Sequence, residues 1–180
     1  MTDVELAKRL AAGEQGALAE FVDRFHAPVF RYLWQAGGSR EDAEDLATQT
    51  LLRARHDAHR FRGEGQLRAW VFRIAYRELL QYRRRQAVFT LWQRRAKLSE
   101  QPPPNEDAVV VTAALGQLSV AHRAAFLLTE VEGLSADEAG QALGVPAGTV
   151  RSRAHYAKRR LREILAPAYP ELNHAEPLPE

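Results

Sequence analysis

Apolar residues recur along this chain at intervals of three and four positions, which is the spacing of an amphipathic α-helix. No stretch shows the strict alternation of a half-buried strand or the turn signal of a hairpin. The pattern therefore predicts an all-α fold. The expected helices cover 2–13, 18–33, 39–54, 66 to beyond 85, 108–117, 120–132, 136–143 and 147–165. The inward face of the helix that starts at Ser39 is expected to comprise Ala43, Leu46, Ala47, Thr50, Leu51 and Ala54.

Local signals support several of these helix ends. Thr2 with Glu5, and Ser135 with Glu138, have the spacing of capping boxes, in which two side chains satisfy the free N–H groups of a first turn. Pro28 lies inside the second expected helix and predicts a kink there, because proline lacks the N–H that the helix ladder needs.

A polar, proline-rich segment, SEQPPPNED, interrupts the helical pattern and carries no apolar period. We expect two small helical domains on either side of a flexible linker. The predicted boundaries are an N-terminal domain over 1–95, a linker over 96–107 and a C-terminal domain over 108–166. The remaining residues, 167–180, are expected to form a tail without regular structure, because four prolines fall within them.

Residues 134–163, LSADEAGQALGVPAGTVRSRAHYAKRRLRE, predict a helix-turn-helix in the C-terminal domain. Gly144 lies where the first of these helices has to end, and Pro146 precedes the second. One face of the second helix is apolar: Val150, Ala154, Ala157, Leu161 and Leu165. Six arginines or lysines and no acid lie between 151 and 162. This segregation favours insertion into a DNA groove; the alternative is a structural helical hairpin with a solvated basic face.

Charge is segregated along the whole chain, although the net charge is only +2 and the sequence pI is about 9.1. Residues 68–97 hold nine bases and one acid, whereas residues 98–141 hold seven acids and one base. Two basic blocks separated by an acidic one suggest two contacts with a polyanion and at least one contact with something else.

Several classes of function find no support in the sequence. The absence of cysteine excludes disulfides, cysteine-based zinc sites and thiol nucleophiles. The six histidines lack metal-ligand spacing, and no glycine-rich phosphate loop occurs, so we expect no metal, no cofactor and no enzymatic activity. The polar start is not a signal peptide and no apolar run could span a bilayer, which predicts a cytoplasmic protein without membrane insertion.

Three strings together, AEDLATQTLLRA over 43–54, LRAWVFRIAYRELLQYRRR over 67–85 and the helix-turn-helix over 134–163, resemble the extracytoplasmic-function (ECF, group IV) sigma factors of bacterial RNA polymerase, within the sigma-70 family. The resemblance covers about residues 5–165. It implies that the N-terminal domain binds the polymerase clamp and opens the minus-ten promoter element. The C-terminal domain would read the minus-thirty-five element as duplex and bind the polymerase flap. The resemblance also implies an anti-sigma factor, and we expect a monomer when the chain is free.

The basic face of the last helix supplies the expected minus-thirty-five contacts. Its first turns come closest to base edges, so Arg151, Ser152 and His155 are the candidates for base readout. Lys158, Arg159 and Arg162 lie further along and are expected to hold phosphates. Thr149, at the helix start, is expected to donate to a phosphate with the help of the helix dipole.

The long helix that begins near Gln66 supplies the expected minus-ten and melting contacts. Arg73, Arg77 and Arg84 share one face, Gln81 borders it, and Tyr76 lies nearby in the sequence. Arginines with interspersed aromatic rings suit single-stranded DNA, because phosphates pair with the charges while unstacked bases stack on the rings. For the neighbouring Trp70, packing in the core and contact with a base both remain open. Within the family, asparagine and aspartate are common where Arg77 and Gln81 stand.

A third surface is expected to contact the core polymerase. Its residues lie on the outward side of the helix that begins after Ser39: Glu41, Asp45, Thr48, Gln49 and Leu52. Leu52 is an apolar side chain on a polar face, which indicates a covered surface; the alternative is a helix end packed by the following loop. The family often has glutamine and then an acid where Thr48 and Gln49 stand. The run Phe126–Leu128 is too wide for one buried stripe, so core packing and contact with a partner both remain open.

The function that follows is a dissociable specificity subunit that directs RNA polymerase to promoters. The alternative is an autonomous transcriptional regulator with a similar helix-turn-helix. A regulator would need an upstream sensor or dimerisation module, whereas residues 66–97 have the character of a second DNA-binding surface.

Overall fold

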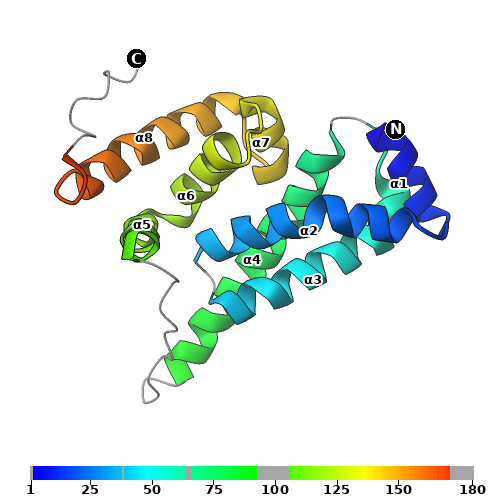
Figure 1. The fold of residues 1–180 in the computed structure, drawn as a ribbon, viewed down its shortest axis with the longest axis horizontal. Helices are drawn as coiled ribbons and strands as arrows, with labels where there is room; N and C mark the ends of the chain where they lie inside the picture. The colour runs from blue at the N-terminus through cyan, green and yellow to red at the C-terminus, as the bar shows by residue number, and fades with distance from the viewer. Residues whose placement is uncertain (1, 38, 64–65, 93–105, 171–180) are drawn as a thin grey trace.

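The computed structural model describes residues 2–37, 39–63, 66–92 and 106–170, and these contain helices and no strand (Figure 1). The all-α fold is confirmed. We call residues 2–92 the N-terminal half and residues 106–170 the C-terminal half. The N-terminal half comprises α1 (Asp3–Ala11), α2 (Ala17–Gln35), α3 (Arg40–Asp57), the short 3₁₀ helix η1 (Ala58–Arg60) and α4 (Leu67–Trp92). The C-terminal half comprises α5 (Glu106–Gly116), α6 (Val120–Phe126), the π-helical turn η2 (Leu127–Val131), α7 (Ala136–Leu143) and α8 (Ala147–Leu165).

The N-terminal half packs α2, α3 and α4 against one another, with α1 across one end of them (Figure 1). All six residues expected on the inward face of α3 are buried. Thr50, the polar member of this face, donates its hydroxyl hydrogen to the carbonyl of Leu46 at 2.7 Å, so it leaves no unsatisfied group in the core. Ser39 caps α3 through a capping box with Asp42. Helix α2 runs on through Pro28.

One expected helix differs from the structure. The segment 120–132 was expected to be a single α-helix, but α6 gives way to η2 after Phe126. A π-helical turn winds the chain more loosely than an α-helix and so changes which side chains point inward. Here Leu127 and Leu128 are both buried. Most of the predicted linker, over 93–105, and the end of the predicted tail, over 171–180, lie outside the described residues.

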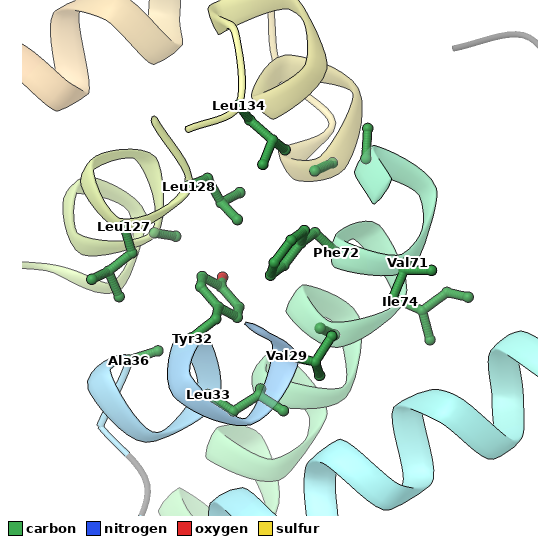
Figure 2. Close-up of a cluster of buried hydrophobic side chains, with 14 of the residues drawn as sticks. Val29, Tyr32, Leu33, Ala36, Val71, Phe72, Ile74, Leu127, Leu128 and Leu134 are labelled. Atoms are coloured by element: carbon green, nitrogen blue, oxygen red, sulfur yellow. The ribbon is translucent and has the colours of Figure 1, made fainter. Parts of the chain in front are cut away.

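The two halves meet along an apolar contact, shown in Figure 2. Tyr32 and Phe72 come from the N-terminal half, on α2 and α4, and their rings pack edge to face at 5.5 Å between centroids. Leu127, Leu128 and Leu134 approach them from the C-terminal half. All five side chains are at most 5% exposed. Helix α7 packs against α4 beside this cluster, so the buried core is continuous between the halves. We call this contact the junction; the sequence pattern did not predict it.

Candidate nucleic-acid interface

Helices α7 and α8 form the helix-turn-helix that the sequence predicts, with the expected bounds. Ser135 and Glu138 make the reciprocal capping box at the start of α7. Gly144 ends α7 in the left-handed conformation, at a φ of 70°, which glycine adopts without steric cost. Gly140 allows the closest approach in the turn, because a Cβ there would lie 2.7 Å from the carbonyl oxygen of Val145. These features fix the angle at which α8 leaves the turn.

The apolar stripe of α8 faces the core of the C-terminal half. Val150, Ala154, Ala157 and Leu161 are buried, and Leu165 is half-buried near the helix end. The opposite face is therefore presented to solvent. On it, Arg151, Ser152, His155 and Arg159 are exposed, while Thr149, Lys158 and Arg162 are half-buried.

Three of these side chains already have partners in the free chain. Lys158 Nζ lies 2.7 Å from a carboxylate oxygen of Glu130, in η2, and forms an ion pair with it. The hydroxyl of Ser152 donates to the carbonyl of Thr149 at 3.0 Å. Arg159 lies over the ring of Tyr156, at 5.7 Å from the centroid. The predicted residues thus lie on one side of α8, and in the free chain Lys158 is paired with Glu130.

A hollow of about 370 Å³ lies beside this face of α8. Its lining comprises Thr129, Glu130, Leu134, Ala136, Arg151, Ala154, His155 and Lys158. Glu130 is the acidic member of this lining, and sequence reasoning missed it. Glu130 lies in the acidic block and close in the sequence to the helix-turn-helix, and this position could have indicated a contact with the basic helix.

The predicted stripe on α4 is also exposed. Arg73, Arg77, Gln81 and Arg84 face solvent, whereas Tyr76 is half-buried and packs against the core. Trp70 is half-buried as well, and its ring lies 5.7 Å from that of Phe61. Of the two interpretations of Trp70, the structure favours core packing. The α4 surface is therefore mainly cationic, with fewer free aromatic rings than the sequence suggested.

The third predicted surface, on α3, lies next to α4. Leu52 is 58% exposed, more than any other large hydrophobic residue among those the structure describes. Glu41, Asp45, Thr48 and Gln49 are exposed around it. The alternative for Leu52, a helix end packed by the following loop, is therefore not supported.

Asp45 and Gln49 also line a small hollow of about 90 Å³ between α3 and α4. On the α4 side the hollow is lined by Glu78, Tyr82 and Arg85. Burial, and then the nearby carboxylate of Asp42, raise the pKa of Tyr82 to about 12, so its hydroxyl stays protonated. Glu78 is nearly buried and forms an ion pair with Arg53 of α3 at 2.5 Å, which ties the two helices together.

The junction carries an acid clasp that the sequence analysis did not foresee. Glu132, at the end of η2, has a side chain with no exposure to solvent. Arg31 of α2 donates to both of its carboxylate oxygens, at 2.9 and 3.0 Å, and Arg68 of α4 donates to one of them at 3.1 Å. The hydrogen bonds to Glu132 raise the pKa of Arg31. We call these three residues the acid clasp.

A second polar contact crosses the junction at the C-terminal end of α2. Arg123 of α6 is buried, and donates to the carbonyl of Ala36 at 2.8 Å and to those of Gly116 and Leu118 at 2.9 and 3.1 Å. Arg83 of α4 donates to the same Ala36 carbonyl at 2.6 Å. Burial, and then the neighbouring charge of Arg83, lower the pKa of Arg123 to about 10. Arg123 therefore remains charged at neutral pH and binds the carbonyl ends of two helices.

The described ranges contain no cluster of potential metal ligands, and no helix within them is long and apolar enough to cross a membrane.

Comparison with known proteins matches both halves to one family. The profile of sigma-70 region 2 matches residues 21–89, and that of sigma-70 region 4 matches residues 108–161. The ECF RNA polymerase sigma factor SigL of Mycobacterium tuberculosis is 34% identical over 165 residues, covering 86% of this chain and 92% of SigL. SigE of Mycolicibacterium smegmatis is 32% identical over 169 residues, covering 87% of this chain and 65% of SigE.

Two solved structures are similar in fold. The sigma factor RpoE of Bartonella quintana, in complex with the anti-sigma factor NepR, superimposes with a TM-score of 0.73 at 24% identity, covering 82% of this chain and 95% of that one. CnrH, in complex with the cytosolic domain of CnrY, gives a TM-score of 0.72 at 27% identity, covering 92% of this chain and 97% of that one.

The pairing of Glu130 with Lys158 leads to a first prediction. Glu130→Gln removes an acid beside the basic face of α8 and frees Lys158 for a phosphate. We expect tighter binding to duplex DNA of any sequence. We also expect the slope of log affinity against log salt concentration to steepen by about 0.9, the value of one added phosphate contact. Fluorescence anisotropy titrations at several salt concentrations measure both.

A matched control is Glu44→Gln, which removes an exposed acid from α3. An unchanged salt slope in Glu130→Gln, or the same change in the control, would show that Lys158 gains no phosphate.

Proposed function

The chain belongs to the ECF sigma factors of bacterial RNA polymerase, and we propose that it binds the core polymerase and directs it to start transcription at specific promoters. The observation that supports this most directly is the presence of two exposed cationic helix faces, on α4 and α8, in halves that match sigma-70 regions 2 and 4. An autonomous regulator has no use for the region 2 half. On this proposal the protein performs no covalent chemistry and acts in the cytoplasm together with the polymerase.

We assign minus-thirty-five recognition to α8. Arg151, Ser152 and His155 are exposed on its first turns, where a recognition helix comes nearest to base edges. An arginine paired with guanine discriminates against other bases by about 1–3 kcal/mol. Arg159 and Arg162 lie further along and contact phosphates, with Thr149 at the helix start. Lys158 joins them once it exchanges Glu130 for a phosphate.

We assign minus-ten binding and strand opening to the exposed face of α4. Arg73, Arg77 and Arg84 follow one line along the helix, which suits the backbone of a displaced strand. Gln81 lies on the same face and has an amide that can bind a base edge. Tyr76, being half-buried, offers only part of its surface. Arg77 and Gln81 replace common family residues, and the added positive charge favours phosphate contact over base selection.

We assign core polymerase binding to the exposed side of α3. Leu52 supplies an apolar centre and Glu41, Asp45, Thr48 and Gln49 supply a polar rim, the usual composition of a protein interface. The solved structure of RpoE holds the anti-sigma factor NepR, and that of CnrH holds the cytosolic domain of CnrY. We propose that an anti-sigma factor also regulates this chain.

Reconstitution tests the function directly. The purified chain, mixed with bacterial core polymerase and genomic DNA, is expected to produce transcripts with a defined set of start sites that core polymerase alone does not produce. Sequencing the 5′ ends of the transcripts identifies these sites. A chain that neither elutes with the core polymerase nor changes where transcripts start is not a sigma factor.

Loss of one α4 cation is expected to separate strand opening from duplex binding. Arg77→Ala removes a charge from the melting face without touching α8. We expect fewer permanganate-reactive thymines at the minus-ten element, with little change in the affinity of the holoenzyme for closed duplex. Lys8→Ala, on the exposed side of α1, is the control for the loss of one positive charge. Unchanged permanganate reactivity would remove Arg77 from the melting surface.

A substitution on the α3 surface is expected to weaken binding to core polymerase and not binding to DNA. Leu52→Asp places a charge at the centre of the proposed interface, so we expect at least a tenfold loss of affinity for core polymerase, which is about 1.4 kcal/mol. DNA binding by the free chain is expected to stay the same. Leu18→Asp, at another partly exposed leucine, is the matched control. Equal affinity of Leu52→Asp and the unmodified chain in a core-binding titration would contradict the assignment.

A further inference from the structure

The acid clasp is unevenly buried, and this asymmetry shows how it works. The side chain of Glu132 has no exposure to solvent, whereas those of Arg31 and Arg68 are 47% and 37% exposed. The arginines can therefore return to water if the halves separate, while the carboxylate depends on them for as long as the halves are closed. Glu132 belongs to the C-terminal half and both of its partners belong to the N-terminal half.

The junction leaves the two DNA-binding surfaces open. Arg73, Arg77 and Arg84 on α4 remain exposed with the halves closed, and so do Arg151 and His155 on α8. Arg68 lies on the other side of α4 from this arginine stripe, as expected from 100° of rotation per residue. Closing the halves therefore does not cover either surface. What it does is fix their separation and relative orientation.

The spacing of the two promoter elements on DNA determines the separation that the two surfaces need in order to bind both elements. Duplex DNA is stiff over the length of a promoter, with a persistence length of about 150 base pairs, so two elements present themselves at a fixed spacing. The clasped halves impose a spacing of their own. In the sequence thirteen residues, 93–105, connect α4 to α5, and a chain of that length can span at most about 45 Å. The covalent connection thus permits the halves to part.

We propose that the acid clasp is a latch which holds the free chain in a closed, single-element state. Opening at Glu132 lets the α4 and α8 surfaces change their separation, so that they engage both elements of one promoter together. The proposal rests on the assigned roles of α4 and α8 in DNA binding.

The interface is polar enough at its margin to open. Its apolar part is centred on Tyr32, Phe72 and Leu128. Its border carries two arginines, Arg83 and Arg123, that share one carbonyl acceptor and repel each other. The Nε atoms of both arginines are buried without a hydrogen-bond partner, and so is the hydroxyl of Tyr32. Unsatisfied groups of this kind are costly while buried and regain water on opening. Loss of the attraction at Glu132 therefore shifts the balance toward the open state.

Glu132→Gln tests the latch with little change of shape. It removes the charge that Arg31 and Arg68 neutralise, and it leaves no buried ion behind because both arginines reach solvent. Since the natural chain has no cysteine, Arg62→Cys and Gln141→Cys, both at exposed positions in opposite halves, provide two unique sites for donor and acceptor dyes. We expect lower energy transfer in Glu132→Gln than in the unmodified background, and a larger radius of gyration by small-angle X-ray scattering of the unlabelled chain.

Binding to three DNA probes, by the unlabelled full chain, tests the functional consequence. One probe carries the duplex minus-thirty-five element alone, one carries the single-stranded minus-ten segment alone, and one joins both at promoter spacing. Glu132→Gln is expected to raise affinity for the joined probe by about tenfold, as removal of a competing closed population does. Affinity for the two single-element probes is expected to stay the same, because both surfaces are exposed in the closed state.

Charge reversal separates a latch from a folding defect. Glu132→Arg is expected to open the chain, and combining it with Arg31→Glu and Arg68→Glu is expected to restore high energy transfer and weak binding to the joined probe. Glu5→Gln, which removes an exposed acid of α1, is the control. Circular dichroism establishes that each variant keeps its helices.

The proposal is overturned if Glu132→Gln keeps the energy transfer and radius of gyration of the unmodified chain, or if opening leaves affinity for the joined probe unchanged. Failure of the proposed function has a different signature. In that case the unmodified chain binds neither single-element probe and selects no start sites with core polymerase, while the two measurements of shape can still respond to Glu132→Gln.

Discussion

The exposed cationic faces of α4 and α8 both depend on an apolar stripe along the opposite side of the helix. In α8, Val150, Ala154 and Ala157 are buried against the other helices of the C-terminal half, so the face with Arg151 and His155 has to point outward. In α4, Val71, Ile74 and Ala75 are buried in the same way and turn Arg73 and Arg77 toward solvent. The hydrophobic effect thus orients the charges, and charges so oriented are what a polyanion can bind without any rearrangement of the helix.

Acidic residues form ion pairs with other cations of the chain. Glu130 pairs with Lys158 beside the recognition face, Glu132 joins the two halves through Arg31 and Arg68, and Glu78 ties α4 to α3 through Arg53. Each pair consumes a positive charge that could otherwise attract DNA of any sequence. A protein that has to select promoters among a large excess of other DNA gains from such pairing, because its electrostatic affinity is sequence-independent and only the remaining contacts discriminate.

The sequence predicted those features that depend on neighbours along the chain. The 3.6-residue period located the helices, the capping residues located the starts of α3 and α7, and Gly144 located the turn. The exposed state of Leu52 and the buried face of α3 followed from the same period. The junction could not be predicted in this way, because residues 31 and 132 lie 101 positions apart and neither is unusual in its own helix. The π-helical turn could not be predicted for a related reason: its residues pack against α2, in the other half.

The acidic block between the two basic blocks now has a structural meaning that composition alone left open. Its expected contact with something other than a polyanion is made in part within the chain, since Glu132 binds arginines of the N-terminal half. An intramolecular contact of this kind has a high effective concentration, set by the short connecting segment, so a modest interface suffices to keep the halves together. The same property makes it easy to displace: a partner that binds the surfaces of both halves at once gains the same advantage of linkage. Core polymerase with promoter DNA, for which α3, α4 and α8 are the proposed contact surfaces, has the arrangement needed to compete with the clasp.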